Sequence, residues 1–188
     1  MNETATEQEL IAILQPETVL EEQLILDPEF REGLLWGKPR RGHPEGPVYK
    51  HIREVLDNIE DLKVANDTRE KLRIIAYAHD SFKHKEDTSH PRNWDLHHSK
   101  LARRFMENWI TDPGILDVIE LHDEVYHIWR FIHLKQKPEQ GIFHKRMLMQ
   151  RLGDQFPLYA MFFRCDTLTG DKDQRPLEWF DIEFKIGQ

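Results

Sequence analysis

The chain has 188 residues, which is enough for one well-buried domain and too few for two ordinary ones. Its formal net charge of −8 argues against a nucleic-acid partner, because proteins that bind a phosphate backbone usually present a basic surface. With 39% hydrophobic residues, one cysteine, acidic first residues and no long apolar run, the chain is typical of a globular cytoplasmic protein with no membrane partner. We therefore expect a single domain over residues 1–188.

Two short helices are predicted at the start of the chain, over residues 5–14 and 17–26, where Pro16 interrupts the helical periodicity. We expect residues 1–35 to form a helical brace on the rest of the domain. A polar loop follows, WGKPRRGHPEGP, whose prolines and glycines predict a rigid turn-rich segment.

The next predicted helix covers residues 48–63, and His51 lies beside its apolar stripe. A further helix runs through the segment REKLRIIAYAHD, with the polar residues 66–68 as candidate N-caps. That helix is strongly apolar and ends in two neighbouring metal-ligand residues, His79 and Asp80. The pair is the most informative feature of the sequence.

Helical periodicity continues to the end of the chain. The remaining predicted helices cover residues 95–110, 114–132, 142–153, 157–168 and 176–185. No segment keeps the apolar-polar alternation of a strand, so the sequence predicts an all-α fold, a single-domain helical bundle. The aromatic segment WFDIEF in the last helix either caps the core or pairs two subunits of a homodimer.

Potential metal ligands lie on or beside most of these helices. They are His51, His79, Asp80, His97, His98, His122 and Asp166, with Asp123 next to His122. Helical bundles build interior metal sites from histidines and carboxylates of several facing helices. Successive ligands here are about one helix and loop apart, so antiparallel packing can return them to one end of the bundle. Asp80 is the natural bridge between two cations, because its carboxylate has two oxygens.

The order of these residues resembles the HD-domain superfamily of metal-dependent phosphohydrolases, whose pattern is a His, then His-Asp, then a distal Asp. The resemblance covers residues 43–172, the expected metal-site core. It implies that His51 is the first ligand, that His79 and Asp80 are the signature pair, and that Asp166 is the distal aspartate.

The resemblance also implies ligands for a second metal between the signature pair and the distal aspartate. His122 matches one of them, and His97 stands five residues before Ala102, as in the corresponding helix of the family. The family's glycine before that alanine is Leu101 here, so the choice between His97 and His98 stays open.

Basic residues near the signature pair favour phosphate chemistry. Lys83 follows the pair as a lysine does in the family, although Ser81 and Phe82 depart from the family's small apolar residue and glycine. We predict Asp80 and Lys83 as catalytic residues. Paired arginines offer forked donors to phosphate oxygens, so the loop before the first ligand helix is a candidate substrate site. The candidate substrate-binding residues are Arg40, Arg41, His43 and Lys50, with Arg164 and Lys172 as further candidates of the same kind.

These residues favour a metal-dependent phosphohydrolase that acts on a nucleotide or another small phosphorylated metabolite, by attack of a metal-activated water on phosphorus. His and Asp ligands suit one or two divalent transition-metal ions, Mn, Fe, Co, Ni or Zn. The resemblance leaves two alternatives, a mixed-valence di-iron oxygenase on the same scaffold and a non-enzymatic regulatory HD module. Substrate, metal identity and oligomeric state stay open.

Overall fold

Helices make up the regular structure of this protein, which we describe from a computed structural model over residues 5–185. The α-helices are α1 (Glu7–Leu14), α2 (Val19–Leu26), α3 (Pro28–Leu35), α4 (Val48–Asp61), α5 (Asn66–Ala78), α6 (His98–Met106), α7 (Pro113–Leu121), α8 (Glu124–His133), α9 (Pro138–Leu152), α10 (Phe156–Thr167) and α11 (Arg175–Glu183). Short 3-10 helices are η1 (Lys83–Lys85), η2 (Trp94–Leu96) and η3 (Gly153–Gln155). The described residues contain no strand, so the all-α prediction is confirmed. None of the described helices is both long and apolar enough to cross a membrane.

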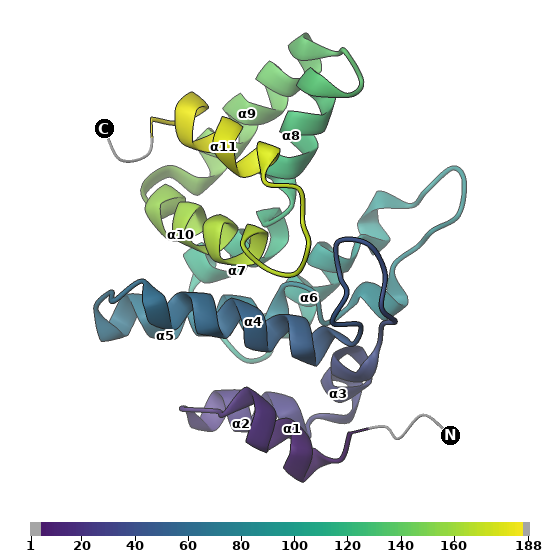
Figure 1. Ribbon diagram of the computed structural model, residues 1–188, viewed down its shortest axis with the longest axis vertical. Helices are drawn as coiled ribbons and strands as arrows, with labels where there is room; N and C mark the ends of the chain where they lie inside the picture. Colours follow the sequence, from purple (N-terminus) through teal and green to yellow (C-terminus); the bar gives the residue numbers. More distant parts are fainter. Residues whose placement is uncertain (1–4, 186–188) are drawn as a thin grey trace.

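The helices form three tiers along the longest axis of the molecule (Figure 1). At one end, α1, α2 and α3 pack together, and α1 and α3 also contact α4. The middle tier contains α4, α5, α6, α7 and α10, with α10 against both α4 and α5. At the other end, the α8 and α9 hairpin packs with α11. The predicted metal ligands all belong to segments of the middle tier or to the turn that leaves it.

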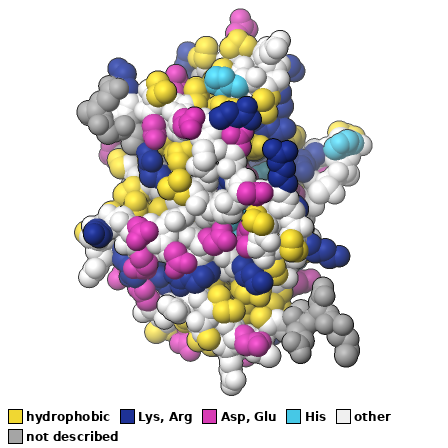
Figure 2. All heavy atoms as spheres, in the orientation of Figure 1, with side chains coloured by type: hydrophobic (Ala, Val, Ile, Leu, Met, Phe, Trp, Pro, Cys, Tyr) yellow, Lys and Arg dark blue, Asp and Glu magenta, His cyan; other side chains and the backbone are white. Residues whose placement is uncertain are grey.

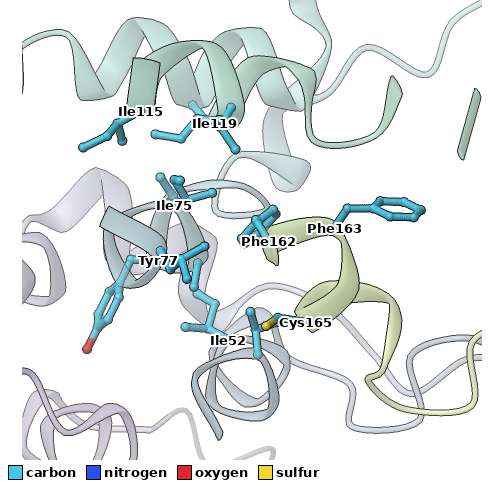
Figure 3. Close-up of a cluster of buried hydrophobic side chains, with 14 of the residues drawn as sticks. Ile52, Ile75, Tyr77, Ile115, Ile119, Phe162, Phe163 and Cys165 are labelled. Atoms are coloured by element: carbon cyan, nitrogen blue, oxygen red, sulfur yellow. The ribbon is translucent and has the colours of Figure 1, made fainter. Parts of the chain in front are cut away.

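The core of the middle tier lies directly behind the predicted ligands. Figure 3 shows Ile75 of α5, Ile119 of α7 and Phe162 of α10 facing one another among other buried apolar side chains, and none of the three is exposed. Burying a side chain of this size stabilises the fold by about 1.5 to 3 kcal/mol. The ring of Phe162 lies 5.1 Å from the ring of His79, centroid to centroid. The core therefore holds the ligand side chains in place from behind.

Two helix starts differ from the prediction. Helix α3 is absent from the predicted elements, although Asp27 and Pro28 form a common helix start: the Asp27 side chain accepts a hydrogen bond of 2.9 Å from the Phe30 N–H. The prediction that residues 66–68 cap the helix before the signature pair is wrong. Ala65 is the N-cap of α5, without a side-chain hydrogen bond, and the polar residues lie in the first turn.

The predicted helix over residues 114–132 is two helices, because the chain turns at His122 and Asp123. Tyr159 of α10 explains the break. Its hydroxyl donates to the His122 carbonyl oxygen at 3.3 Å and accepts from the Val125 N–H at 3.2 Å. An inserted hydroxyl forms hydrogen bonds with backbone N–H and C=O groups that would otherwise bond to each other along a continuous helix. Sequence periodicity cannot reveal this, since the inserting side chain comes from elsewhere in the chain.

The surface carries both signs of charge. On the face drawn in Figure 2, Lys and Arg side chains are interspersed with Asp and Glu. That face therefore lacks the continuous basic surface typical of proteins that bind a nucleic-acid backbone. In the last helix, Phe180 is buried and packs on Phe163, while Ile182 is 77% exposed.

Candidate metal centre

Asp80 lies at the centre of a group of histidines and aspartates in the middle tier. It follows the end of α5, is 3% exposed, and its two carboxylate oxygens face different sets of side chains. We call these the first cluster (His51, His79, Asp80 and Asp166) and the second cluster (His98, His122, Asp80 and Asp123). The end of α5 also supplies His79, and four further stretches supply the remaining members, namely α4, the start of α6, the α7–α8 turn and α10.

In the first cluster, five pairs of potential ligand atoms lie 2.9 to 3.7 Å apart. His51 Nε2 is 2.9 Å from Asp166 Oδ1 and 3.2 Å from His79 Nε2. Asp80 Oδ2 is 3.5 Å from His79 Nε2 and 3.7 Å from His51 Nε2. With metal bonds of about 2.1 Å, neighbouring ligand atoms stand about 3.0 Å apart in an octahedron and about 3.4 Å apart in a tetrahedron. The spacing therefore suits a single cation.

The second cluster has the same spacing around the other oxygen of Asp80. His98 Nε2 is 3.3 Å from both His122 Nε2 and Asp123 Oδ2. Asp80 Oδ1 is 3.5 Å from the Nε2 atoms of both histidines. Asp80 thus joins two sets of side chains, each with two imidazoles and a carboxylate of its own.

The other ring nitrogen of each histidine faces an oxygen acceptor. His79 Nδ1 donates to the Ala76 carbonyl oxygen at 2.9 Å, and His122 Nδ1 donates to that of Ile119 at 2.9 Å. A carbonyl oxygen only accepts, so these bonds place the proton of a neutral ring on Nδ1 and leave Nε2 free as a ligand. This orientation through the second nitrogen is typical of metal-binding histidines.

Glutamates lie beside the Nδ1 atoms of the other two histidines, although neither of these Nδ1 atoms forms a hydrogen bond within the described residues. Glu45 Oε1 lies 3.6 Å from His51 Nδ1, and Glu86 Oε1 lies 3.4 Å from His98 Nδ1. All four Nε2 atoms of the two clusters therefore point into the site, with their Nδ1 atoms turned toward acceptors.

The protonation states also suit cations. Burial alone raises the pKa of Asp80, but Lys83 and His79 more than offset it and hold the pKa well below its usual range. Burial similarly opposes ionisation of Asp166, whose pKa is held well below its usual range by Lys172 and His51. Burial lowers the pKa of His51 to about 3, so its imidazole is neutral and able to bind a metal.

Without a metal ion, a proton on His122 balances part of this negative charge, and a cation in the second cluster would have to displace that proton from Nε2. Burial lowers the pKa of His122, but Asp123 and Asp80 together raise it to about 9. In addition, Asp80 Oδ1 is buried and has no hydrogen-bond partner among the described residues. A buried anionic oxygen without a partner is costly unless a cation compensates it. The residues present therefore fit a bound metal ion.

Both clusters open onto one cavity of about 280 Å³. Basic side chains in its wall are Arg41, His43, Lys83 and Lys172, and apolar ones are Tyr126, Phe163 and Pro176. Lys83 Nζ donates to Asp80 Oδ2 at 2.5 Å, and Lys172 Nζ donates to Asp166 Oδ1 at 2.8 Å. The cavity thus combines the carboxylates with cationic groups able to receive an anion.

The structure brings six of the seven predicted ligands together: His51, His79, Asp80, His98, His122 and Asp166. His97 lies outside both clusters; its Nδ1 is 2.9 Å from Ser99 Oγ and its Nε2 is 3.4 Å from Glu86 Oε1. Adjacent residues at a helix start point in different directions, so only one of the two histidines can face Asp80.

The predicted substrate-binding residues are divided between different surroundings. Arg41 and His43 line the cavity together with Lys83. Arg40 lies over the Trp36 ring, 5.8 Å from its centroid, and lines a separate small cavity. Lys50 is exposed on α4 and does not line the main cavity.

Three carboxylates of the site are missing from the predicted ligand and substrate residues. Asp123 belongs to the second cluster, and the repeat of an adjacent His-Asp pair at 122 and 123 is the sequence signal that identifies it. Glu45 and Glu86 lie beside the Nδ1 atoms of His51 and His98, and no local sequence pattern marks either glutamate.

No family model, no curated protein and no solved structure matches this chain. The class of protein is therefore defined by the fold and the site themselves. This is an all-α protein with buried histidine and aspartate clusters that could hold metal ions, an arrangement compatible with an HD-like fold.

Proposed function

We propose that this protein is a metal-dependent phosphohydrolase of the HD type, acting on a nucleotide or another small phosphorylated metabolite. The observation that carries the proposal is the pair of clusters joined by Asp80, open to a cavity with Arg41, Lys83 and Lys172 in its wall. Two-cation sites that cleave phosphate esters need two adjacent sets of ligands and groups that bind the phosphate.

The residues of the first cluster would hold one cation and those of the second cluster another, with Asp80 shared between them. Mixed imidazole and carboxylate ligands suit Mn, Fe, Co, Ni or Zn. Such ions, when bound, lower the pKa of a coordinated water and neutralise charge on phosphoryl oxygens. The deep burial of His79, His122 and Asp80 limits access of bulk water to this chemistry.

The residues around the cavity would bind and orient the substrate. Arg41 and Lys83 offer charge-assisted hydrogen bonds to phosphate oxygens, which are among the stronger polar contacts in proteins. Lys83 donates to the carboxylate that both clusters share. Its ammonium would therefore be able to contact a phosphate bound next to both clusters. Tyr126, Phe163 and Pro176 would contact the organic part of the substrate.

Elemental analysis of the protein, purified without chelators or a metal-affinity tag, tests the proposal. Asp80→Ala removes the carboxylate shared by both clusters, and Asp57→Ala removes an exposed carboxylate of α4 as the matched control. We expect about two transition-metal ions per chain in the wild type and in Asp57→Ala, and loss of both in Asp80→Ala. The Mn, Co or Ni protein should then hydrolyse members of a phosphatase and nucleotidase panel.

Two outcomes overturn the proposal. In the first, the wild type holds no metal even after reloading, which leaves no catalytic site. In the second, Asp80→Ala changes neither the metal content nor any activity, which removes Asp80 from the chemistry and supports a regulatory module. The same ligand set suits iron, so iron-loaded protein is also assayed for oxygen uptake. Oxygen consumption without phosphate release would replace the hydrolase with a di-iron oxygenase.

A further inference from the structure

We infer that a third cation site, formed by His97, Asp123 and His127, lies on the outer side of the second cluster. The inference goes beyond the proposed function, because neither His97 nor His127 belongs to either cluster. The potential ligand atoms of the three side chains lie within 4.8 Å of one another. This spacing allows all three to contact one ion.

The backbone explains why these residues meet. His97 is the N-cap residue of α6, and Asp123 precedes the first residue of α8. His127 follows one turn later, with its N–H bonded to the Asp123 carbonyl oxygen at 3.0 Å. Residues four apart on a helix lie on the same face, so Asp123 and His127 both face the start of α6. The break after α7, which directs Asp123 toward the second cluster, therefore also forms this site.

The ring of His97 is held as the rings of the cluster histidines are held. Its Nδ1 pairs with Ser99 Oγ at 2.9 Å, and Trp94 stacks on the ring with an interplanar angle of 23°. The residue is only 8% exposed, yet its ring lies 6.1 Å from the ring of His127, centroid to centroid. Its other nitrogen, Nε2, is 3.4 Å from Glu86 Oε1, which is longer than a usual hydrogen bond, so this nitrogen stays available as a ligand.

A second cavity, of about 360 Å³, gives solvent access to this site. His97, Asp123 and His127 line it together with Glu124, so its wall favours a cation. The basic groups in the same wall are already paired. Lys100 bonds to Asp95 at 2.9 Å, and Arg151 bonds to Asp117 at 2.8 Å and to Glu120. Since Asp123 also lines the main cavity, it connects the two sites.

The chemistry of the three side chains indicates the kind of ion. Two imidazoles and one carboxylate suit Zn, Fe, Mn or Co, with the remaining positions open to water. Three protein ligands, two of them partly exposed, bind less tightly than a buried set of four. We therefore expect this site to fill after the two clusters and to exchange its ion faster.

Equilibrium dialysis of the metal-free full chain against increasing Zn²⁺, with the bound zinc measured at each step, tests the inference. We expect about three ions per chain at saturation in the wild type, and loss of the weakest one in His127→Gln with the two tighter ones retained. His133→Gln is the matched control, because this exposed histidine lies on the same helix away from the site. Asp80→Asn should lose the tighter ions and keep the weak one.

These variants separate failure of the inference from failure of the proposed function. Saturation of the wild type without a weaker ion, or an equal loss in His133→Gln, overturns the third site and leaves the two clusters untouched. A wild type that binds the weak ion but not the two tighter ones counts against the two clusters instead. Melting of each metal-free variant is monitored by circular dichroism, and His97→Gln must reproduce the result if His127→Gln does not fold.

Discussion

Lys83 Nζ donates a hydrogen bond of 2.5 Å to Oδ2 of Asp80, the oxygen that also faces His51 and His79. The ammonium therefore competes with any cation of the first cluster for the same oxygen. Asp80 is buried and Lys83 is half-buried, so solvent screens the competition only in part. A phosphate bound next to this oxygen would offer the ammonium a second partner.

Replacement of Lys83 should separate the binding of metal from the binding of substrate. In Lys83→Met we expect Mn²⁺ to bind about tenfold more tightly, because one competing positive charge is gone, and kcat/KM for the best phosphoester to fall by at least about tenfold. Titration calorimetry and steady-state kinetics measure the two effects. Lys85→Met, which removes an exposed lysine paired with Glu29, should change neither. Unchanged kinetics in Lys83→Met would rule out phosphate binding by this residue.

The metal-free protein should lose stability at both low and high pH. Burial lowers the pKa of His51 to about 3 and that of His97 to about 4, so below about pH 6.5 the unfolded chain binds protons that the folded chain does not. Stability therefore falls as the pH falls through this range. Ionised Asp80, Asp123 and Asp166 extend the loss further into acid, since their pKa values are also lowered on folding.

The alkaline side depends on His122, whose pKa is raised to about 9 by Asp123 and Asp80 against the effect of burial. The folded state binds this proton more tightly than the unfolded state does. Its contribution is complete below about pH 6.5 and is lost as the pH rises through 9. Urea midpoints in excess chelator between pH 4 and 10 measure both sides. His122→Gln should flatten the alkaline side, and an unchanged alkaline slope would contradict the assignment.

The buried ion pair between Arg73 of α5 and Glu21 of α2 should be the most sensitive contact of the N-terminal helices. Arg73 donates two hydrogen bonds, of 2.9 and 2.8 Å, to the Glu21 carboxylate, and both residues are about fully buried. Glu21→Gln removes the buried counter-charge and leaves the guanidinium only the partly exposed Glu17 and Glu60, so it should cost about 1.5 to 3 kcal/mol of unfolding free energy. Asp57→Asn, which breaks the exposed pair with Arg53, should cost less than about 1 kcal/mol. Equal urea midpoints for the two variants would refute this difference.

Gly33 should be required for the packing of α3 against the metal centre. A Cβ built on Gly33 lies 1.6 Å from the carbonyl oxygen of Ser81, the residue after Asp80. Gly33→Ala must therefore push α3 and this segment apart, and we expect a loss of at least about 2 kcal/mol of unfolding free energy together with weaker metal binding. Glu32→Ala, at the neighbouring exposed position, should leave both unchanged. Wild-type metal affinity in Gly33→Ala would show that α3 does not position Asp80.

The sequence by itself determined the fold class and the chemical types at the centre. Period-3.6 patterns predict helices wherever a helix buries one face, and most of the α-helices follow from them, including α4 with His51 on its inner side. The adjacent pair His79 and Asp80 at the end of α5 could be predicted because it depends only on local sequence. The break between α7 and α8 could not, since it needs the hydroxyl of Tyr159 from α10.

The tertiary structure alone decided which side chains meet. Side chains of adjacent residues at a helix start point about 100° apart, so only the packing of α6 on α7 selects His98, and not His97, to face Asp80. The same holds for Arg41 and Arg40, whose side chains reach different cavities from one loop. The roles of Asp123, Glu45 and Glu86 likewise depend on distances across the fold. Periodicity records which face of a helix is buried, whereas the partners of that face are set by three-dimensional packing.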